Sequence, residues 1–533
     1  MNQILHIFKK DARRHWPEIL ISLTLLALFT RRELHFWLEG NGSLDVKSLI
    51  ISQVTKIISP ILVAFWAFLI VRVVQTDSLV GDRQWWITKP YEWTKLLFAK
   101  LLFILVFISI PLVSVQLLLL HYSGFSALPN FVGVLLMQIN PLLLLILFSL
   151  TLACLTRNLG QALLAAGVAL VAMITASWLT SQFTGDSIRE SSKFSQTLQS
   201  FLTFGPLLFT PIWQFARRKT WASRGALLFS FAAATLISIL PSGNHLEQSH
   251  PLVAMKDAPV QFVVPPIPES KGDQGAWPNY SSTIPITIPV NVSGVAQGTM
   301  VFLDELDITS DSPQDSRWSR GWSRAYAQIW PEAQREDLTY AVKHKEYEET
   351  KSKPLNLHIQ LLLSEYQETD SRTLLVSPGP FQDNYLGICR VHPFSPSTIE
   401  CFKPFQAPAY IARFDAPNSP CASVSKTFNG TPANRDVAYS WQPPRDEFLP
   451  QSGLNPIVET ALNFNSVSRI PDSNATSRSS YGFAVLCTGA EIRLSRPVLK
   501  RQFRIQLDLP NTRLQDLVRG LPTGASGGMA VGL

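Results

Sequence analysis

Hydrophobic residues follow two patterns along this chain, with long apolar runs up to about residue 240 and short alternating runs after it. A helix needs about 20 mostly apolar residues to cross roughly 30 Å of hydrocarbon. The first run is interrupted by Arg31 and Arg32 and the sixth carries two prolines, so six spans remain an alternative to seven. The predicted spans lie at about residues 16–35, 55–75, 96–120, 131–155, 159–181, 199–216 and 223–240.

The alternating runs predict a β-rich second half. Stretches such as STIPITIPVNVSGV and RQFRIQLDL are rich in β-branched or alternating residues and are separated by clusters of Pro, Gly, Ser, Asp and Asn. Strands of this length and spacing are typical of sandwich folds. We therefore expect an α-helical polytopic membrane domain at 1–240, a linker at 241–270, a β-rich domain of one or two sandwiches at 271–518 and a flexible tail at 519–533.

Charge separates the same two halves. Residues 1–240 hold 20 Lys and Arg against 10 Asp and Glu, whereas the remaining residues hold 26 against 29. Lys and Arg in short loops stay on the cytoplasmic side of a membrane because they are hard to translocate. They cluster before the first span, between the second and third, and between the sixth and seventh. This distribution predicts a cytoplasmic N-terminus and an extracytoplasmic, sandwich-like β-rich domain.

Cysteine usage agrees with that location. Four cysteines fall in the second half, an even number that suits two disulfides in an oxidising compartment: Cys389, Cys401, Cys421 and Cys487. They allow three pairings, and their spacing does not select one. A zinc site is the rival interpretation, and it is disfavoured because no C-x-x-C pair occurs.

The sequence contains no recognisable catalytic motif. No Gly-Lys dipeptide occurs, which excludes a G-x-x-x-x-G-K-[ST] phosphate loop, and HExxH is absent as well. The cluster of His245, Glu247 and His250 is more typical of a solvated linker beside a membrane than of a metal site. We therefore expect no catalytic residue, no resident metal and no enzyme activity in this chain itself.

Four amide side chains lie within the predicted spans: Gln116, Gln138, Asn140 and Gln161. Such groups are costly in hydrocarbon and usually face protein or a cavity. They predict hydrogen bonds between helices or, alternatively, part of a substrate pathway. No dense chain of Asp, Glu and His crosses the spans, which argues against a proton-driven transporter.

The segment TDSLVGDRQWWITKPYEWTKLLFAKLL, residues 76–102, is the most unusual stretch. An acidic, turn-prone start leads to an aromatic pair, a Thr-Lys-Pro break and an amphipathic stretch that continues into the third span. Tryptophans suit the membrane interface, and Pro90 ends one short helix and allows another to begin. The pattern predicts a helix on the membrane surface that contacts a cytoplasmic partner, with an ordinary interfacial loop as the alternative.

This pattern, D-x-L-x-G-D-x-x-W-W-x-T-K-P followed by L-L-x-A-K-L-L, resembles the first cytoplasmic loop of permease subunits of type-2 ABC exporters, especially bacterial ones. The N-terminus, ILHIFKKDARRHWPEIL, is similar to their basic amphipathic entry helix. The resemblance covers roughly residues 1–240. It implies that the loop transmits ATP-driven movement through Asp82, Trp85, Trp86, Thr88, Lys89, Pro90, Trp93 and Lys95.

The same resemblance implies the partners. ATP and Mg²⁺ would be bound by a separate cytoplasmic nucleotide-binding subunit, and a second permease chain, identical or different, would complete the path through the lipid bilayer of a bacterial cytoplasmic membrane. No nucleic-acid partner is expected. The transported substrate is not indicated.

Two features depart from that family. Its members commonly have six spans, and an external domain of about 290 residues is not part of the usual minimal permease. A membrane-anchored envelope protein that binds or senses through its external β domain is therefore the main alternative. A membrane-bound enzyme with its site in the external half is the third hypothesis.

Overall fold

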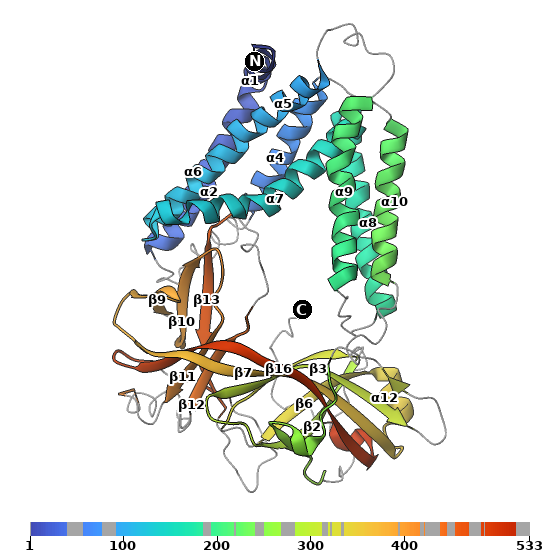
Figure 1. Cartoon of the computed structure of the whole chain (residues 1–533), viewed down its shortest axis with the longest axis vertical. Coiled ribbons are helices and arrows are strands. Elements are labelled where there is room, and N and C mark those ends of the chain that lie inside the picture. Colours follow the sequence, from blue (N-terminus) through green and yellow to red (C-terminus); the bar gives the residue numbers. More distant parts are fainter. Residues whose placement is uncertain are drawn as a thin grey trace.

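Helices and sheets occupy opposite ends of the molecule in the computed structural model (Figure 1). We call the end of the helical region next to the sheets its sheet-facing end, and the opposite end its distal end. The structure describes residues 2–39, 57–76, 92–184, 193–217, 220–239, 250–267, 283–311, 318–319, 322–331, 335–392, 395–415, 420–421, 437–444, 454–467, 481–483 and 486–518.

The described residues of every predicted span are mainly helical. Five helices in the described ranges are long and apolar enough to cross a membrane: α4 (Ile58–Gln75), the continuous pair α5 (Trp93–Ile104) and α6 (Ile110–Tyr122), α7 (Ala127–Leu155), α8 (Leu159–Thr184) and α10 (Thr220–Ile239). The other helices are α1 (Asn2–Arg14), α2 (Trp16–Glu39) and α9 (Lys193–Arg217). Of these, α2 lies at the first predicted span, which Arg31 and Arg32 interrupt, and α9 at the sixth, which carries two prolines.

A π-helical turn, η2 (Leu105–Ser109), joins α5 to α6. Pro111 is the second residue after it, and a proline inside a helix removes one backbone hydrogen bond and clashes with the carbonyl four residues earlier. The wider turn accommodates that clash, so the chain continues as one helix instead of breaking.

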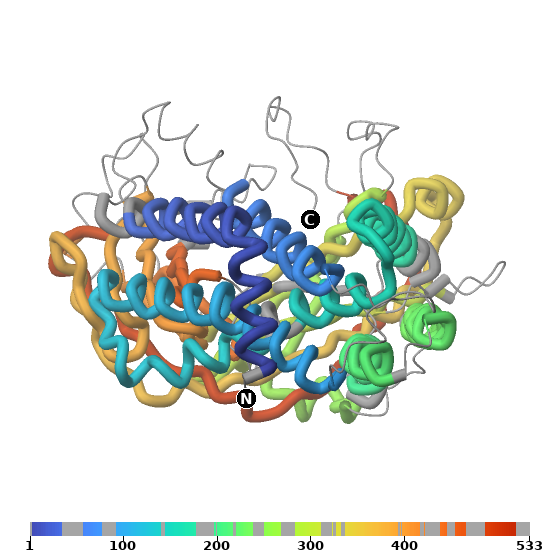
Figure 2. The backbone as a smooth tube through the Cα atoms, turned by 90° about the horizontal axis from the view of Figure 1, so that it is seen from above, coloured from blue at the N-terminus to red at the C-terminus, as the bar shows by residue number. Residues whose placement is uncertain are grey.

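The helices bury side chains to different extents. Trp66, Leu62 and Phe103 are fully buried between helices, whereas aliphatic side chains such as Leu163 and Leu164 on α8 are largely exposed. Seen from above, α8, α9 and α10 lie to one side of the other helices (Figure 2). Exposed aliphatic surface of this extent is unfavourable in water and is the property expected of a membrane protein.

The described strands form three antiparallel sheets, which we call the β region. One sheet has the order β1 (Gln261–Val263), β2 (Thr283–Ser293), β6 (Arg335–Lys343). A second has the order β13 (Ile457–Asn463), β10 (Ser395–Pro404), β9 (Gly387–His392), β8 (Phe381–Asp383). The third is built on β3 (Thr299–Asp311), β7 (Leu355–Leu375), β16 (Glu491–Thr512) and β11 (Tyr410–Asp415), with β4 (Trp318–Ser319), β5 (Ser323–Ile329), β12 (Val437–Gln442), β14 (Asn465–Val467) and β15 (Tyr481–Phe483) at its two ends.

Strands β7 and β16 contribute to two separate hydrophobic cores. Ile359 and Ile505 pack with β1, β2 and β6 in the first core, whereas Leu374 and Ile492 pack with β9, β10 and β11 in the second. Disulfides join Cys389 to Cys401 and Cys421 to Cys487 in the second core, which is one of the three pairings that the sequence left open. Cys154 is a free cysteine buried among the helices.

Residues 250–267 belong to the β region, although the sequence predicts a linker at 241–270. Val260 and Phe262 lie in the first core, and Arg504 exchanges backbone hydrogen bonds with Pro251 and Val253 at 2.8–2.9 Å. Residues before the predicted domain start at 271 thus take part in the first core. Strand β1 has three residues, and it exists because it pairs with β2, which a local pattern does not reveal.

Glu365 joins β7 to β16 through a buried ionic contact. Its side chain is 4% exposed, and it accepts hydrogen bonds from Lys500 Nζ at 2.9 Å and Arg501 Nε at 2.6 Å. Burial favours the neutral carboxyl group, but the two cations outweigh it and hold the pKa of Glu365 below its usual value.

We expect this contact to make stability fall with acidity. A lowered folded-state pKa contributes stability above the unfolded Glu pKa of about 4.3, and this contribution is lost as pH falls through the folded pKa. Thermal unfolding of the full-length protein between pH 6 and pH 3 should therefore show a smaller loss for Glu365→Gln than for the wild type. Glu348→Gln, at an exposed ion pair with Lys351, is the control and should follow the wild type. Identical profiles for Glu365→Gln and wild type would contradict the expectation.

Candidate functional site

A buried ion pair joins three helices at the distal end. Lys100 Nζ in α5 donates hydrogen bonds to Asp11 Oδ2 in α1 at 2.8 Å and to the Val73 carbonyl in α4 at 2.9 Å, and it lies 3.5 Å from Thr76 Oγ1. The side chains of Lys100 and Asp11 are each 1% exposed. The segment 77–91 connects α4 to α5, so this contact holds together the two helices that the segment joins.

Burying this ion pair between helices costs free energy. Removing two charges from water costs several kcal/mol per ion, and their attraction repays this cost only with good geometry and additional hydrogen bonds. The Val73 carbonyl supplies one such bond, whereas Asp11 Oδ1 is buried without a partner in the described part of the chain. A buried pair is weak evidence for stability, so its position suggests a role in fixing the relative placement of α1, α4 and α5.

Aromatic and ionic contacts surround the pair. The ring of Phe8 in α1 stacks on the ring of Phe107, with the two ring centroids 5.7 Å apart. The ring centroids of Phe103 and Phe107 are 4.8 Å apart. Arg72 Nη2 at the end of α4 donates to Glu18 Oε1 in α2 at 3.3 Å. Helices α1, α2, α4 and α5 are therefore cross-linked at the distal end by both apolar and charged side chains.

Most of the predicted coupling residues lie outside the described residues, namely Asp82, Trp85, Trp86, Thr88, Lys89 and Pro90. Trp93 and Lys95 lie in the first turn of α5. Trp93 is exposed, and Lys95 forms an exposed ion pair with Glu92 at 2.8 Å.

Sequence reasoning did not single out Lys100 and Asp11. Each of the two residues is a charge beside apolar residues, and this was the available signal. Lys100 interrupts LLFAKLLFIL, and Asp11 lies one helical turn after the buried Ile7. Two such charges of opposite sign are candidates for a buried pair, although the chain offers several other combinations.

The amides predicted within the spans have different environments. Gln138 Nε2 donates to Gln116 Oε1, which links α7 to α6. Gln161 instead takes part in the cap of α8: Asn158 Oδ1 accepts the Gln161 backbone N–H at 2.8 Å, and Gln161 Oε1 accepts the Arg157 backbone N–H at 3.0 Å. The side chain of Asn140 lies outside the described residues.

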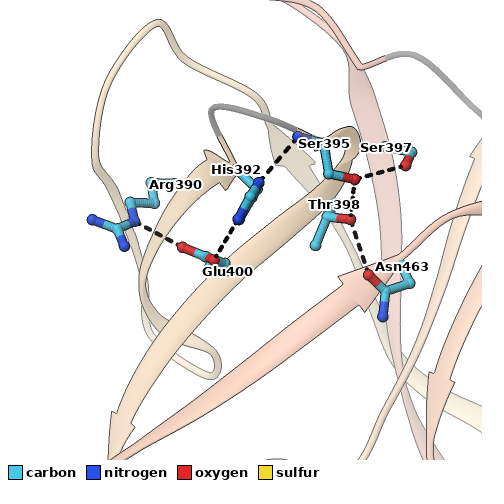
Figure 3. Close-up of polar contacts among 7 residues, drawn as sticks. All are labelled: Arg390, His392, Ser395, Ser397, Thr398, Glu400 and Asn463. Carbon is cyan, nitrogen blue, oxygen red and sulfur yellow. Dashed lines mark hydrogen bonds and ion pairs between the residues drawn. The ribbon is translucent and has the colours of Figure 1, made fainter. Parts of the chain in front are cut away.

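A second polar group lies on β9, β10 and β13 (Figure 3). Glu400 accepts a hydrogen bond from Arg390 Nε at 2.9 Å and lies 3.4 Å from His392 Nε2. His392 Nδ1 accepts the Ser395 backbone N–H at 3.0 Å, so a neutral ring carries its proton on Nε2, facing the carboxylate.

This group is organised for structure more than for nucleophilic catalysis. An activated serine needs its hydroxyl within hydrogen-bonding reach of the imidazole. Ser395 Oγ instead shares hydrogen bonds with Ser397 Oγ and Thr398 Oγ1, and Thr398 continues the chain of bonds to Asn463 Oδ1 in β13. These bonds hold the start of β10 against β13.

No group of three or more His, Cys, Asp or Glu side chains suited to a metal ion occurs in the ranges that the structure describes. No family model and no curated protein matches the sequence. Among solved structures, red sea bream transglutaminase matches with 9% identity, a TM-score of 0.11, and coverage of 52% of this chain and 35% of the transglutaminase chain. The chain thus spans about a third of that protein, and a TM-score this low carries no argument about fold or function.

Proposed function

We propose that this chain is the membrane-spanning permease subunit of an ATP-driven exporter. The observation that supports the proposal best is the contact of Lys100 in α5 with α1 and α4 at the base of the segment 77–91. This is the segment whose sequence resembles the loop of permeases that contacts the nucleotide-binding subunit. The resemblance in sequence and the contact that holds the flanking helices together therefore concern the same part of the chain.

A partner that moves segment 77–91 would act on helices that are already held together. α4 ends at Gln75 and α5 begins at Trp93, and Lys100 bonds α4 and α1 from within α5. A displacement of the segment would then shift α1, α4 and α5 as one unit instead of bending a single helix. Rigid-body movement of this kind is a common means of transmitting a conformational change.

The partners and location follow from the same proposal. ATP and Mg²⁺ would be bound by a cytoplasmic subunit, and a second permease chain would complete the path. The N-terminus and the distal end would face the cytoplasm of a bacterium. The β region would then lie outside the cytoplasmic membrane, and the two cores, each shared between sheets, support sandwich-like domains there.

The test is purification of the full-length protein in mild detergent, with mass spectrometry and ATPase assay of the same sample. We expect a stoichiometric ATPase, and we expect Trp85→Ala combined with Lys89→Glu to reduce ATPase copurification at least tenfold without changing the elution volume of the permease. Lys353→Glu, on the exposed surface of the β region, is the matched charge-reversal control and should retain the ATPase.

Two results would contradict the proposal. A double variant that retains a full complement of active ATPase would remove the segment from the mechanism. A wild-type protein that purifies alone, or only with envelope proteins, would favour the alternative of a membrane-anchored protein that binds or senses through its β region.

A further inference from the structure

Residues Leu454–Ile457 enter the sheet-facing end of the helical region, and we call them the wedge. The carbonyl of Leu454 accepts a hydrogen bond from Gln116 Nε2 in α6 at 2.9 Å, although the two residues are 338 positions apart. The Leu454 side chain packs against the core formed by the helices. Asn455 Nδ2 donates to Glu33 Oε2 in α2 at 2.8 Å. The wedge thus contacts two helices through polar groups and apolar surface together.

The turn after β10 supports the wedge. The backbone N–H of Phe405 donates to the Pro456 carbonyl at 2.8 Å, and Phe405 has a φ of 67°, a left-handed conformation that is unusual for a large residue. Its ring lies against Gly133 of α7, where an added Cβ would be 2.3 Å from Phe405 Cε2. The absent side chain at Gly133 therefore makes the space that this ring occupies.

Apolar contacts extend the same surface. Leu120 of α6 and Val134 of α7 are buried together with Phe402 of β10 and Ile457 at the start of β13. The sheet β8–β9–β10–β13 is consequently packed onto α6 and α7, and Figure 1 shows β10 and β13 reaching the lower ends of these helices.

The wedge reaches the amides that the sequence marked as a possible pathway. Gln116 lies six residues before the end of α6 at Tyr122, which places it about 9 Å inside the helical region at about 1.5 Å per residue. Gln116 bonds both Gln138 and the Leu454 carbonyl, while Gln138 Oε1 is buried without a partner among the described residues. The wedge is therefore hydrogen-bonded to Gln116, one of the two amides that a solute crossing between α6 and α7 would meet.

We propose that the wedge closes the extracytoplasmic end of the permease and withdraws when that end opens. This inference rests on the proposed function, because it takes Gln116 and Gln138 to line an export path. Withdrawal breaks the bonds from Gln116 to Leu454 and from Asn455 to Glu33 and separates Phe405 from Gly133. A movement of the helices therefore also moves the sheet β8–β9–β10–β13. The β region thus takes part directly in opening the extracytoplasmic end.

Cysteine accessibility in the full-length protein tests insertion of the wedge. In a Cys154→Ala background in lipid nanodiscs, a membrane-impermeant maleimide should label Leu454→Cys at least tenfold more slowly than Ala461→Cys, an exposed position on β13. Adding Glu33→Ala and Gln116→Ala should raise the labelling rate of Leu454→Cys severalfold and leave that of Ala461→Cys unchanged. Equal labelling of the two cysteines without these changes would overturn the insertion.

The same label tests closure in the purified complex with its ATPase. Mg-ATP should speed labelling of Leu454→Cys severalfold, and an oxidised cross-link between Gly133→Cys and Phe405→Cys should abolish that increase. Phe405→Ser alone, which removes the ring from Gly133 without adding a thiol, should retain it. An ATPase that hydrolyses ATP while the labelling rate stays constant would overturn the closing role. If no ATPase copurifies, the proposed function fails and closure fails with it, but slow labelling of Leu454→Cys would still establish the inserted wedge.

Discussion

Lys100→Met should destabilise the helical region by about 3–5 kcal/mol, because it leaves Asp11 as an uncompensated buried charge. The measurement is size-exclusion chromatography of the detergent-solubilised protein after heating. The temperature at which the monodisperse peak disappears should be much lower for Lys100→Met than for the wild type. Contacts of Lys100 with Val73 and Asp11 are lost together, so α1 should be held to α4 and α5 by apolar contacts alone.

Two further variants distinguish charge from packing. Asp11→Leu combined with Lys100→Met replaces the pair with apolar side chains, and this double variant should recover most of the stability because the desolvation cost disappears with both charges. Lys95→Met breaks the exposed pair with Glu92 and should cost less than about 1 kcal/mol. If Lys100→Met is no less stable than Lys95→Met, the buried pair does not hold these helices.

The second large effect concerns the disulfides of the β region. In the chain-entropy model a cross-link stabilises more when it closes a longer loop, about 4 kcal/mol for the 66-residue separation of Cys421 and Cys487 and about 3 kcal/mol for the 12-residue separation of Cys389 and Cys401. Replacing Cys421 and Cys487 by alanine should therefore accelerate native-state proteolysis of the β region more than the same change at Cys389 and Cys401.

The free cysteine provides the control for this comparison. Cys154→Ala removes a buried thiol from the helices and should leave cleavage of the β region unchanged. Faster proteolysis of the Cys389→Ala, Cys401→Ala variant than of the other pair would contradict the loop-length argument. It would indicate that the shorter cross-link, between the neighbouring strands β9 and β10, matters through packing in the second core instead.

The helices and many of the strands follow from local patterns. A long apolar run satisfies its backbone groups only as a helix in hydrocarbon, so each of the seven predicted runs is helical. The alternation in TIPITIPVNVS becomes β2, with Ile284, Ile286 and Ile288 buried on one face. Both patterns act over a few residues, which is why the sequence alone identifies them.

Contacts between distant segments could not be predicted in the same way. Asp11 and Lys100 are 89 positions apart, and each appears in the sequence only as an isolated charge beside apolar residues. QSGLNPIV around Leu454 has the composition of an ordinary loop, and its insertion beside Gln116 depends on how β13 is placed against α6. Gln161 was predicted to bond another helix or to line a pathway, and its hydrogen bonds to Arg157 and Asn158 instead depend on where α8 begins.

The long strand β16 also constrains the order in which the protein can form during synthesis. Its first part lies in the second core and its later part in the first core, and it begins at residue 491, close to the C-terminal end of the described chain. Neither core can be completed until this strand has emerged and paired with β7. Pairing across long sequence separations is slow and leaves strand edges and apolar surface exposed meanwhile. We therefore expect newly made chains to depend on chaperones on the side of the membrane where the β region folds.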